Sequence, residues 1–221
     1  MQHIVGNLDG LRVLVGMECS GIIRDEFRKR GADAWSCDLK PCEGDSRWHL
    51  QGNVFQEVYA DRWDLGIFHP ECRYLTVAGA RWQTEKSGWM DKQAEAIEFA
   101  EAVWGLRRYI PHLAVENPVG FLSTRSKLGK PTQIVQPWMF GDEYKKGTCW
   151  WLHNLPGLLP TSDSDGSNAV PACWLHPPTK DPEERRTNRA RTYPGHAAAI
   201  ADQWGAFCIA NAANQARSEA E

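Results

Sequence analysis

The stretch that most constrains this fold is a short apolar run, Leu65 to Phe68, which leads directly into His69-Pro70-Glu71-Cys72. A run this brief, bounded by a proline and by polar residues, predicts a buried strand. In open α/β sheets, ligands bind in the crevice outside the carboxyl ends of the strands. The thiol of Cys72 is therefore a candidate nucleophile, although a single cysteine is also often a small buried hydrophobic residue.

The segment upstream predicts the opening unit of a nucleotide-binding α/β domain. Residues 12–15 (RVLV) read as a strand, residues 16–21 as a glycine-bearing loop, and a helix follows from Ile22 until Gly31 ends it. Backbone N–H groups at the start of such a helix favour an anionic ligand group. The GxGxxG pattern is absent, so the dinucleotide fingerprint is not met.

Two further strand ends are expected nearby. A strand around residues 34–37 ends at Asp38, and residues 48–54 predict a short strand that ends at Gly52-Asn53. A carboxylate at the second strand end commonly accepts hydrogen bonds from ribose hydroxyls, and an ordinary loop aspartate is the alternative interpretation.

The middle of the chain predicts a second reactive group on the same rim. Residues 73–88 form an irregular loop, long enough to be a mobile flap, and residues 90–109 form the clearest helix. The next strand, 113–115, ends in Glu116-Asn117-Pro118. Strands joined by one crossover helix are usually neighbours, so Cys72 and Glu116 are expected on one edge of the sheet. The buried stripe of the helix is expected at Ala94, Ile97, Ala100 and Trp104.

The remaining segments complete a single domain. Residues 148–152 read as a late strand, 156–190 as a flexible insert that is mostly loop, and 196–212 as a final helix. We therefore predict one α/β domain over residues 1–221, Rossmann-like, with a mostly parallel sheet, helices on both faces and no separate target-recognition domain.

Composition excludes several classes of protein. No run approaches the length of a membrane span, and the N-terminal residues do not have the shape of a signal peptide. The seven cysteines form no CxxC pair, which predicts a reducing cytoplasm and neither a disulfide framework nor a metal site.

Charge gives a weaker indication of a partner. The formal net charge is −3, but residues 120–191 carry ten Lys or Arg against seven Asp or Glu, a net of +3. This mildly basic region suits phosphate groups, and a solvated mixed surface explains it equally well.

These motifs, in this order, resemble those of the S-adenosylmethionine-dependent DNA cytosine-5 methyltransferases, and more closely the small phage and prophage proteins of that kind. The resemblance covers residues 11–205. It rests on the loop VGMECSG, on Asp38, on Gly52-Asn53-Val54, on Pro70-Glu71-Cys72, on Glu116-Asn117-Pro118 and on the closing stretch RTYPGHAAAIADQWG.

The resemblance implies a methyltransferase that acts on DNA in the cytoplasm of a bacterial host, with S-adenosylmethionine as cofactor and Cys72 and Glu116 as catalytic residues. The implied cofactor-binding residues are Gly16, Glu18, Ser20, Gly21, Asp38, Asn53, Val54 and His69. The implied substrate-binding residues are Asn117, Pro118, Lys145, Lys146, Arg189 and Arg191. Without a recognition domain, a very short target is expected, unless the chain forms a homodimer or borrows a partner.

Several positions depart from the family pattern. Glu18-Cys19-Ser20 stands where the family prefers glycines, Asn53 replaces an aspartate, and Glu71 replaces the proline before the nucleophile. A carboxylate beside the thiol disfavours the thiolate, so a nearby cation (Arg73, Lys146 or Arg191) is expected to offset it. The family's Arg-x-Arg is not visible.

Two other functions remain open. His69-Pro70-Glu71-Cys72 weakly resembles the Asp-Pro-Pro-Tyr motif of amino-methyltransferases, with a cysteine in place of the aromatic residue. The altered cofactor loop is equally compatible with a non-catalytic phage DNA-binding protein on a degenerate methyltransferase fold.

Overall fold

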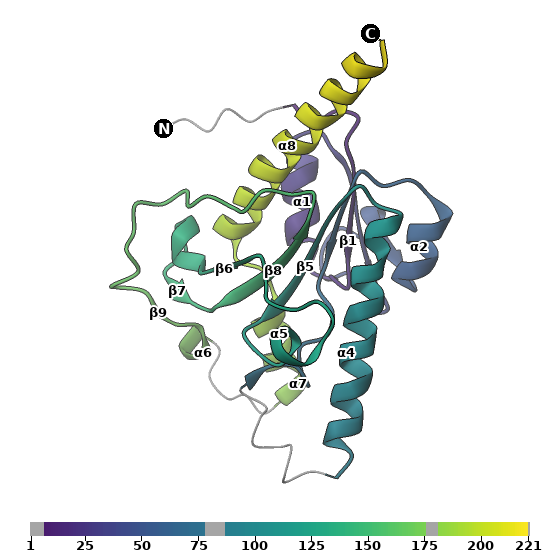
Figure 1. The fold of residues 1–221 in the computed structure, drawn as a ribbon. Helices are drawn as coiled ribbons and strands as arrows, with labels where there is room; N and C mark the ends of the chain where they lie inside the picture. Colours follow the sequence, from purple (N-terminus) through teal and green to yellow (C-terminus); the bar gives the residue numbers. More distant parts are fainter. Residues whose placement is uncertain (1–6, 78–86, 176–180, 221) are drawn as a thin grey trace.

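A seven-stranded mixed sheet forms the centre of the computed structural model, which describes residues 7–77, 87–175 and 181–220. The strand order is β3-β2-β1-β4-β5-β8-β6 (Figure 1). These strands are β1 (Arg12–Gly16), β2 (Asp33–Asp38), β3 (His49–Gln51), β4 (Leu65–Phe68), β5 (His112–Pro118), β6 (Gln133–Val135) and β8 (Thr148–His153). A separate pair joins β7 (Tyr144–Lys145) to β9 (Val170–Pro171).

The order of the strands reverses between β1 and β4. Strands β1 to β5 are all parallel, so the chain builds outward from β1 in one direction and then from β4 in the other. Such a reversal is the topological switch point at which doubly wound sheets bind ligands. Strand β8 is antiparallel to both β5 and β6, and its first residue, Thr148, pairs with Pro118. The start of β8 therefore lies at the same edge as the ends of β1, β4 and β5.

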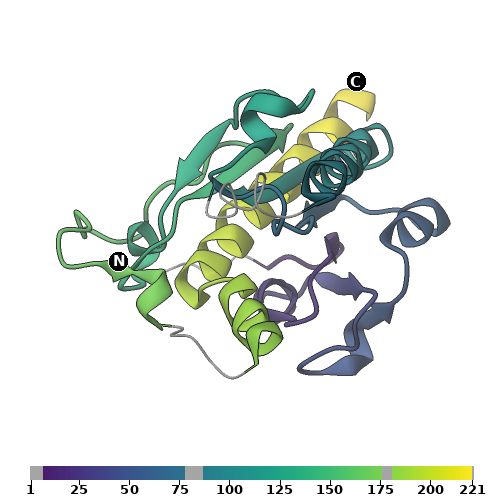
Figure 2. The same ribbon diagram turned by 90° about the horizontal axis from the view of Figure 1, so that it is seen from below.

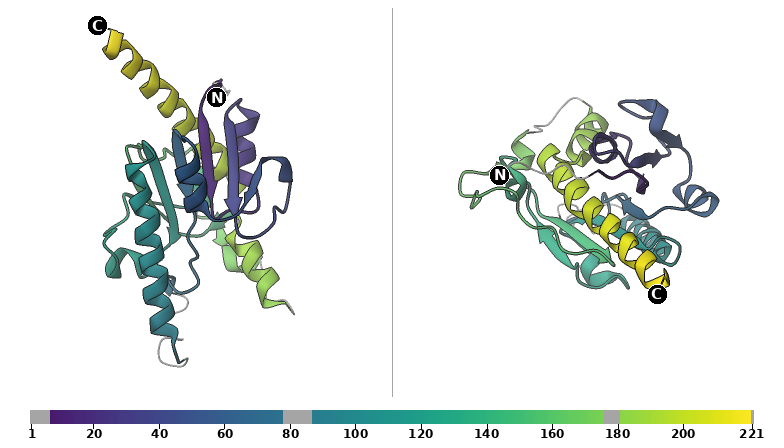
Figure 3. Two further views of the ribbon diagram at one scale, coloured as in Figure 1. Left: turned by 90° about the vertical axis from the view of Figure 1, so that its right-hand side faces the viewer. Right: turned by 90° about the horizontal axis from the view of Figure 1, so that it is seen from above.

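Helices cover both faces of the sheet, and together with the parallel strands they confirm the predicted α/β class. Helices α1 and α8 pack on one face, and α2 and α4 on the other (Figures 1 and 3). The last turns of α8 extend beyond the sheet (Figure 3). The helices are α1 (Ile22–Lys29), α2 (Val54–Ala60), α4 (Trp89–Gly105), α5 (Leu122–Arg125), α6 (Ala172–Leu175), α7 (Pro182–Ala190) and α8 (Pro194–Ala220). Short 3₁₀ turns occupy Ser46–Trp48, Leu106–Arg108 and Pro137–Phe140.

Alternation along the strands produces the two layers of core. Val13 and Val15 of β1 face α1 and α8, whereas Leu14 faces α2 and α4. On β8, Trp150 packs edge to face on Trp204 of α8, with ring centroids 5.0 Å apart, and both are almost fully buried. Each buried side chain of this size contributes roughly 1.5–3 kcal/mol through removal of apolar surface from water. The core on the two faces packs the central strands whose ends form the carboxyl edge.

The sequence-based boundaries differ from the structure in several places. The predicted insert contains helix α7, and the sequence did not predict α2 or β6. Ala94, expected in the buried stripe of α4, is exposed, because Gln93 takes the inner position and donates to the Tyr74 carbonyl at 2.6 Å. The expected flap, 73–88, lies largely outside the described residues. Within the described ranges, no helix is both long and apolar enough to cross a bilayer.

One glycine fixes the contact between the segment after Cys72 and the segment after Glu116. Gly120 lies against the main chain of Leu75, whose carbonyl accepts the N–H of Phe121 at 2.6 Å. A Cβ at position 120 would overlap that carbonyl, and neither backbone has room to move without disturbing this hydrogen bond. The two strand ends therefore approach as closely as they do only with glycine here.

We predict that Gly120→Ala destabilises the protein by roughly 1–3 kcal/mol, as overpacking usually does. The matched control is Gly105→Ala at the end of α4, where no described heavy atom lies within 4 Å of the added Cβ and the backbone is helical. That change should be neutral or stabilise by up to about 1 kcal/mol. Urea denaturation of both variants checks the pair, and equal stabilities would contradict the close contact at Gly120.

Candidate active site

The segment after β4 carries Cys72 away from the sheet in a fixed direction. The N–H of His69 donates to the Gly16 carbonyl at 3.0 Å, which ties the start of this segment to the end of β1. The carbonyl of Cys72 then accepts the N–H groups of Leu75 and Thr76 at 3.0 and 3.1 Å. Cys72 therefore opens a tight turn directly outside the switch point, and its side chain is only partly exposed.

Glu116 lies within β5 and not, as the sequence predicted, just past its end. Strand β5 continues to Pro118 because β8 pairs with it along its whole second half, with Glu116 opposite Trp150. Strand β4 pairs with β5 only as far as Phe68 and Val115. Glu116 is thus the first residue of β5 beyond the β4 ladder, on the side from which the Cys72 segment departs.

A buried amide joins the two segments. Asn117 is fully buried, and its Nδ2 donates to the carbonyl of Pro70 at 2.9 Å. Its Oδ1 is also buried and has no hydrogen-bond partner among the described residues. Asn117 therefore sets the spacing between the strand ends, whereas the sequence placed it with substrate.

Glu116 is held as a carboxylate by a hydrogen bond from His69 and by the positive charge of Lys146. Its Oε2 lies 3.3 Å from His69 Nδ1, and its side chain is 18 % exposed. Burial acts to raise the pKa of Glu116, but the hydrogen bond from His69 and the nearby charge of Lys146 bring that pKa below its ordinary value. Glu116 is therefore ionised at neutral pH.

The surroundings of Cys72 shift its pKa in the opposite direction. Burial raises the pKa of its thiol, and the negative charge of Glu116 raises it further, with a smaller contribution of the same sign from Glu71. Lys146 lowers the pKa but does not cancel these effects. The expected opposition from Glu71 is present, and Lys146 is the cation that offsets it. The thiol of Cys72 is accordingly protonated at neutral pH in this conformation.

Lys146 and Lys145, adjacent in sequence, have different surroundings. Lys145 belongs to β7 and is exposed, whereas Lys146 lines a small cavity and donates from Nζ to the Arg189 carbonyl at 2.9 Å. The reversed direction of β8 brings Lys146 to the edge where Cys72 and Glu116 lie. Only Lys146 of the pair therefore belongs to this site.

The cavity is closed by the segment between α7 and α8. Its volume is about 20 Å³, enough for roughly one water molecule and far less than a base requires. Its walls come from residues at the ends of β4 and β5 and around the start of β8, from the end of α7 and the first turn of α8, and from the α7–α8 linker, residues 191–193 (Figure 2). The lining residues are His69, Glu116, Lys146, Thr148, Trp150, Ala190, Arg191, Thr192, Tyr193 and His196.

An ion pair ties this linker to the segment that follows β2. Arg191 Nε lies 2.8 Å from Glu43 Oε2, and the N–H of Glu43 donates to the Cys19 carbonyl at 2.8 Å. The sequence placed Arg191 on substrate phosphate, but here its guanidinium is paired with Glu43. Arg189, also expected at the substrate, is exposed and contributes its carbonyl to Lys146.

The loop after β1 has left-handed backbone near both ends, and only Met17 is strained by it. Gly16 carries no side chain because Phe68 and Val54 fill the space that a Cβ would need. Met17 has φ 57° and Gly21 has φ 76°, both in the left-handed region. For methionine this conformation costs roughly 1–2 kcal/mol, and such strain often marks a ligand-binding loop.

This loop contains an acceptor that has no partner within the described part of the chain. Glu18 is only 7 % exposed; its Oε1 contacts the Ser20 hydroxyl, and its Oε2 is buried without a hydrogen-bond partner. Leaving a buried acceptor unpaired costs roughly 1–3 kcal/mol. An ammonium or hydroxyl group of a ligand would satisfy Glu18 Oε2.

The next two strand ends carry the other expected cofactor residues. Asp38 ends β2, and its Oδ1 accepts the N–H of Lys40 at 2.9 Å. Asn53 is the N-cap of α2, with Oδ1 accepting the N–H of Phe55 at 3.0 Å, a role that the sequence interpretation missed although asparagine favours it. Val54 is buried beneath Gly16, so it packs in the core at this position.

His196 is the main residue of the site that the sequence analysis left without a role. It is buried in the first turn of α8, stacks on Phe140 with ring centroids 4.7 Å apart, and accepts from Trp150 Nε1 at 3.3 Å. Burial lowers its pKa to about 3, which keeps the ring neutral. In the sequence the stretch RTYPGH contributes only to the family resemblance. Its contact with β8 arises from the tertiary structure.

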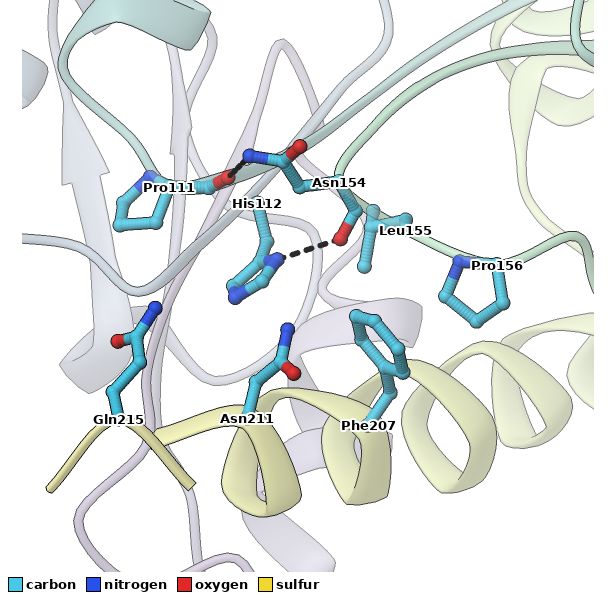
Figure 4. A pocket seen from close by; sticks show the side chains of 8 residues that line it. All are labelled: Pro111, His112, Asn154, Leu155, Pro156, Phe207, Asn211 and Gln215. Carbon is cyan, nitrogen blue, oxygen red and sulfur yellow. Dashed lines mark hydrogen bonds between the residues drawn. The ribbon is translucent and has the colours of Figure 1, made fainter. Parts of the chain in front are cut away.

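A larger cavity, of about 490 Å³, lies at the opposite edge of the sheet (Figure 4). Figure 4 shows His112, at the start of β5, with its Nδ1 donating to the Asn154 carbonyl at 2.7 Å, and with Asn211 and Gln215 of α8 across the opening. Its remaining walls are proline, leucine and phenylalanine side chains. It has no nucleophile or carboxylate, so we place the chemistry at the carboxyl edge.

Comparisons with known proteins give no family for this chain. No protein-family model matches it, and no curated protein is similar enough in sequence to be a relative. Among the described residues no group of three or more His, Cys, Asp or Glu side chains is arranged to hold a metal ion.

We predict that the charge of Glu116 controls the reactivity of Cys72. Because Glu116 raises the pKa of the Cys72 thiol, Glu116→Gln should lower that pKa and speed alkylation by iodoacetamide at neutral pH. Lys146→Met should have the opposite effect, since Lys146 lowers the pKa. Mass spectrometry of the Cys72 peptide measures both rates, and Cys72→Ser identifies the signal. A slower reaction in Glu116→Gln would contradict the assignment.

Proposed function

We propose that this chain transfers a methyl group from S-adenosylmethionine to carbon 5 of cytosine in DNA, through a covalent adduct on Cys72. The observation that carries the proposal is the meeting of Cys72, Glu116 and Lys146 at the topological switch point of a doubly wound sheet. The motif order that resembles the cytosine-5 methyltransferases supports the same assignment.

The proposed roles follow from the chemistry of the base. Carbon 5 of cytosine is a poor nucleophile, and addition of the Cys72 thiolate at carbon 6 turns the ring into an enamine that reacts at carbon 5. Glu116 would bind the N3 edge and share a proton as charge develops there. Lys146 would favour the thiolate form of Cys72. Loss of the carbon 5 proton and expulsion of the thiolate then release the product.

The residues at the first three strand ends fit the cofactor in part. S-adenosylmethionine supplies an activated methyl group on a sulfonium. Glu18 Oε2 is an unpaired acceptor suited to its ammonium group, and Asp38 stands where a carboxylate accepts from ribose. The helix start at Gly21 offers main-chain N–H groups. Asn53 is a weaker candidate for cofactor binding, because its Oδ1 already caps α2.

A base of duplex DNA would have to leave the stack before it reached Cys72. The cavity is too small for a base, so the 191–193 linker would also have to move outward, which would break the Arg191–Glu43 pair. Arg191 would then be released toward phosphate, as the sequence expected. Lys145 and Arg189 are already exposed and suit the same role.

A second candidate is favoured by the protonated state of Cys72. A thiol whose pKa is raised by burial and by Glu116 is a poor nucleophile, and an amino-methyltransferase needs none. In that reaction Cys72 would form only part of the pocket wall. The position of the new methyl group on the base separates the two reactions.

The experiment is incubation of the pure protein with labelled S-adenosylmethionine and DNA, followed by nucleoside mass spectrometry. We expect 5-methylcytosine, and a cytosine with fluorine at carbon 5 should trap the protein covalently. Cys72→Ser should lose both, and Glu116→Gln should slow transfer on the order of 10²–10⁴-fold. An N4- or N6-methylated product that persists in Cys72→Ser would establish the second candidate instead.

Cofactor binding has its own test, which does not require turnover. Asp38→Ala should weaken binding of S-adenosylmethionine by about 1–3 kcal/mol in calorimetry, the usual loss for a hydrogen bond to a charged group. Glu98→Gln, on the exposed face of α4, is the control and should bind as the native chain does. Absence of any binding by the native chain would favour the non-catalytic DNA-binding protein.

A further inference from the structure

The two ring nitrogens of His69 have different surroundings. Nδ1 lies 3.3 Å from Glu116 Oε2, whereas Nε2 is buried and has no hydrogen-bond partner among the described residues. The imidazole also meets Trp150 edge to face, with ring centroids 6.0 Å apart, and lines the closed cavity. The sequence assigned His69 to the cofactor, but only its main chain contacts the cofactor loop, through Gly16.

The contact with Glu116 fixes which nitrogen carries the proton. An ionised carboxylate only accepts hydrogen bonds, and the pKa of Glu116 is below its ordinary value, so His69 Nδ1 must be the donor. In the neutral imidazole the other nitrogen, Nε2, is then an acceptor. This tautomer leaves a lone pair of electrons directed away from Glu116.

Nothing else on the cavity wall satisfies that lone pair. Two other polar groups on the wall are already engaged: Lys146 Nζ donates to the Arg189 carbonyl, and His196 Nε2 accepts from Trp150. A buried acceptor without a donor is costly, and a well-placed ligand N–H removes that cost. His69 Nε2 is therefore suited to a donor brought in by the substrate.

We propose that His69 Nε2 accepts a hydrogen bond from the exocyclic amino group of the target base. The inference rests on the proposed function, in which a base occupies this cavity, and it adds a residue that determines specificity. An amino-bearing pyrimidine offers an N–H to Nε2 and to the adjoining Glu116 carboxylate. A 4-keto base, such as uracil or thymine, would turn an oxygen toward two acceptors and be rejected.

The size of this discrimination separates it from simple packing. When a site hydrogen-bonds a substrate N–H, kcat/KM for an analogue that lacks this N–H is lower by roughly 10⁴- to 10⁵-fold, because the buried acceptors are left unpaired. A difference of shape alone, on the scale of a methylene group, gives roughly 10–200-fold. His69 would supply part of the larger effect, with Glu116 supplying the rest.

The first experiment needs no turnover. Nitrogen-15 NMR of the histidine side chains reports which ring nitrogen carries the proton, and His69→Asn identifies the His69 signals. We expect the Nδ1–H tautomer, and an Nε2 shift that moves when an oligodeoxynucleotide with one cytosine is added but not when uracil replaces it. A proton on Nε2 in the free protein, or equal responses to the two oligonucleotides, would overturn the proposal.

The second experiment measures specificity. Asparagine at position 69 can donate to Glu116 as Nδ1 does but has no group at the Nε2 position, so His69→Asn removes the acceptor and keeps the donor. We expect kcat/KM to fall at least about tenfold more for a cytosine target than for a 2-pyrimidinone target, which lacks the amino group. His69→Gln, which loses the Nδ1 donor, is the control and should slow both targets.

The outcomes are distinguishable. Equal losses for both targets in His69→Asn would show that His69 only supports the structure, and would overturn the inference while the methyltransferase stands. If the native chain modifies neither base, the proposed function fails, and the NMR experiment alone decides whether His69 reads an amino group.

Discussion

A buried hydrogen bond, from Asn117 Nδ2 to the Pro70 carbonyl, is central to the geometry of the candidate site. It joins two segments 47 residues apart in sequence, each at the end of a central strand. Because Asn117 is fully buried, removal of its side chain would leave the Pro70 carbonyl without its donor. The spacing of Cys72 from Glu116, and with it the electrostatic coupling of these two groups, depends on this bond. The contact of Gly120 with Leu75 supports it from the next turn of the chain.

The sequence predicted those elements that are determined by interactions between residues close together in the chain. Leu65–Phe68 is a strand with the predicted bounds, because a short apolar run between polar breakers has few alternatives. The glycine loop was predicted from its place after the first strand. The crossover rule predicted that Cys72 and Glu116 lie on the same edge of the sheet. Tertiary contacts decided the rest. Lys146 reaches the site only because β8 runs backwards, and His196 only because α8 packs on that strand. Gln93, and not Ala94, faces inward because it has a carbonyl to bind.

The pKa values of Glu116 and Cys72 are shifted in opposite directions, and the two shifts are coupled through the charge of Glu116. Glu116 is stabilised as an anion by His69 and Lys146, and that same anion disfavours a thiolate at Cys72. A site built only for thiolate chemistry would keep a carboxylate farther away. The arrangement fits a nucleophile that is activated only when a ligand adds positive charge or neutralises Glu116. Protonation of Glu116 on the base, or a cation beside Cys72, would each lower the pKa of the thiol.

The closed position of the α7–α8 linker is consistent with a thiol that is activated only when a ligand binds. In this conformation Arg191 is paired with Glu43 and Lys146 with a main-chain carbonyl, so both cations are occupied while the cavity holds at most about one water molecule. Entry of a base would separate these contacts and free both cations beside the incoming nucleotide. Lys146, no longer bound to the Arg189 carbonyl, would be free to move toward Cys72, and a shorter distance between the two groups would strengthen its effect on the pKa of the thiol. Opening of the linker and activation of the thiol would thus depend on the same side chain.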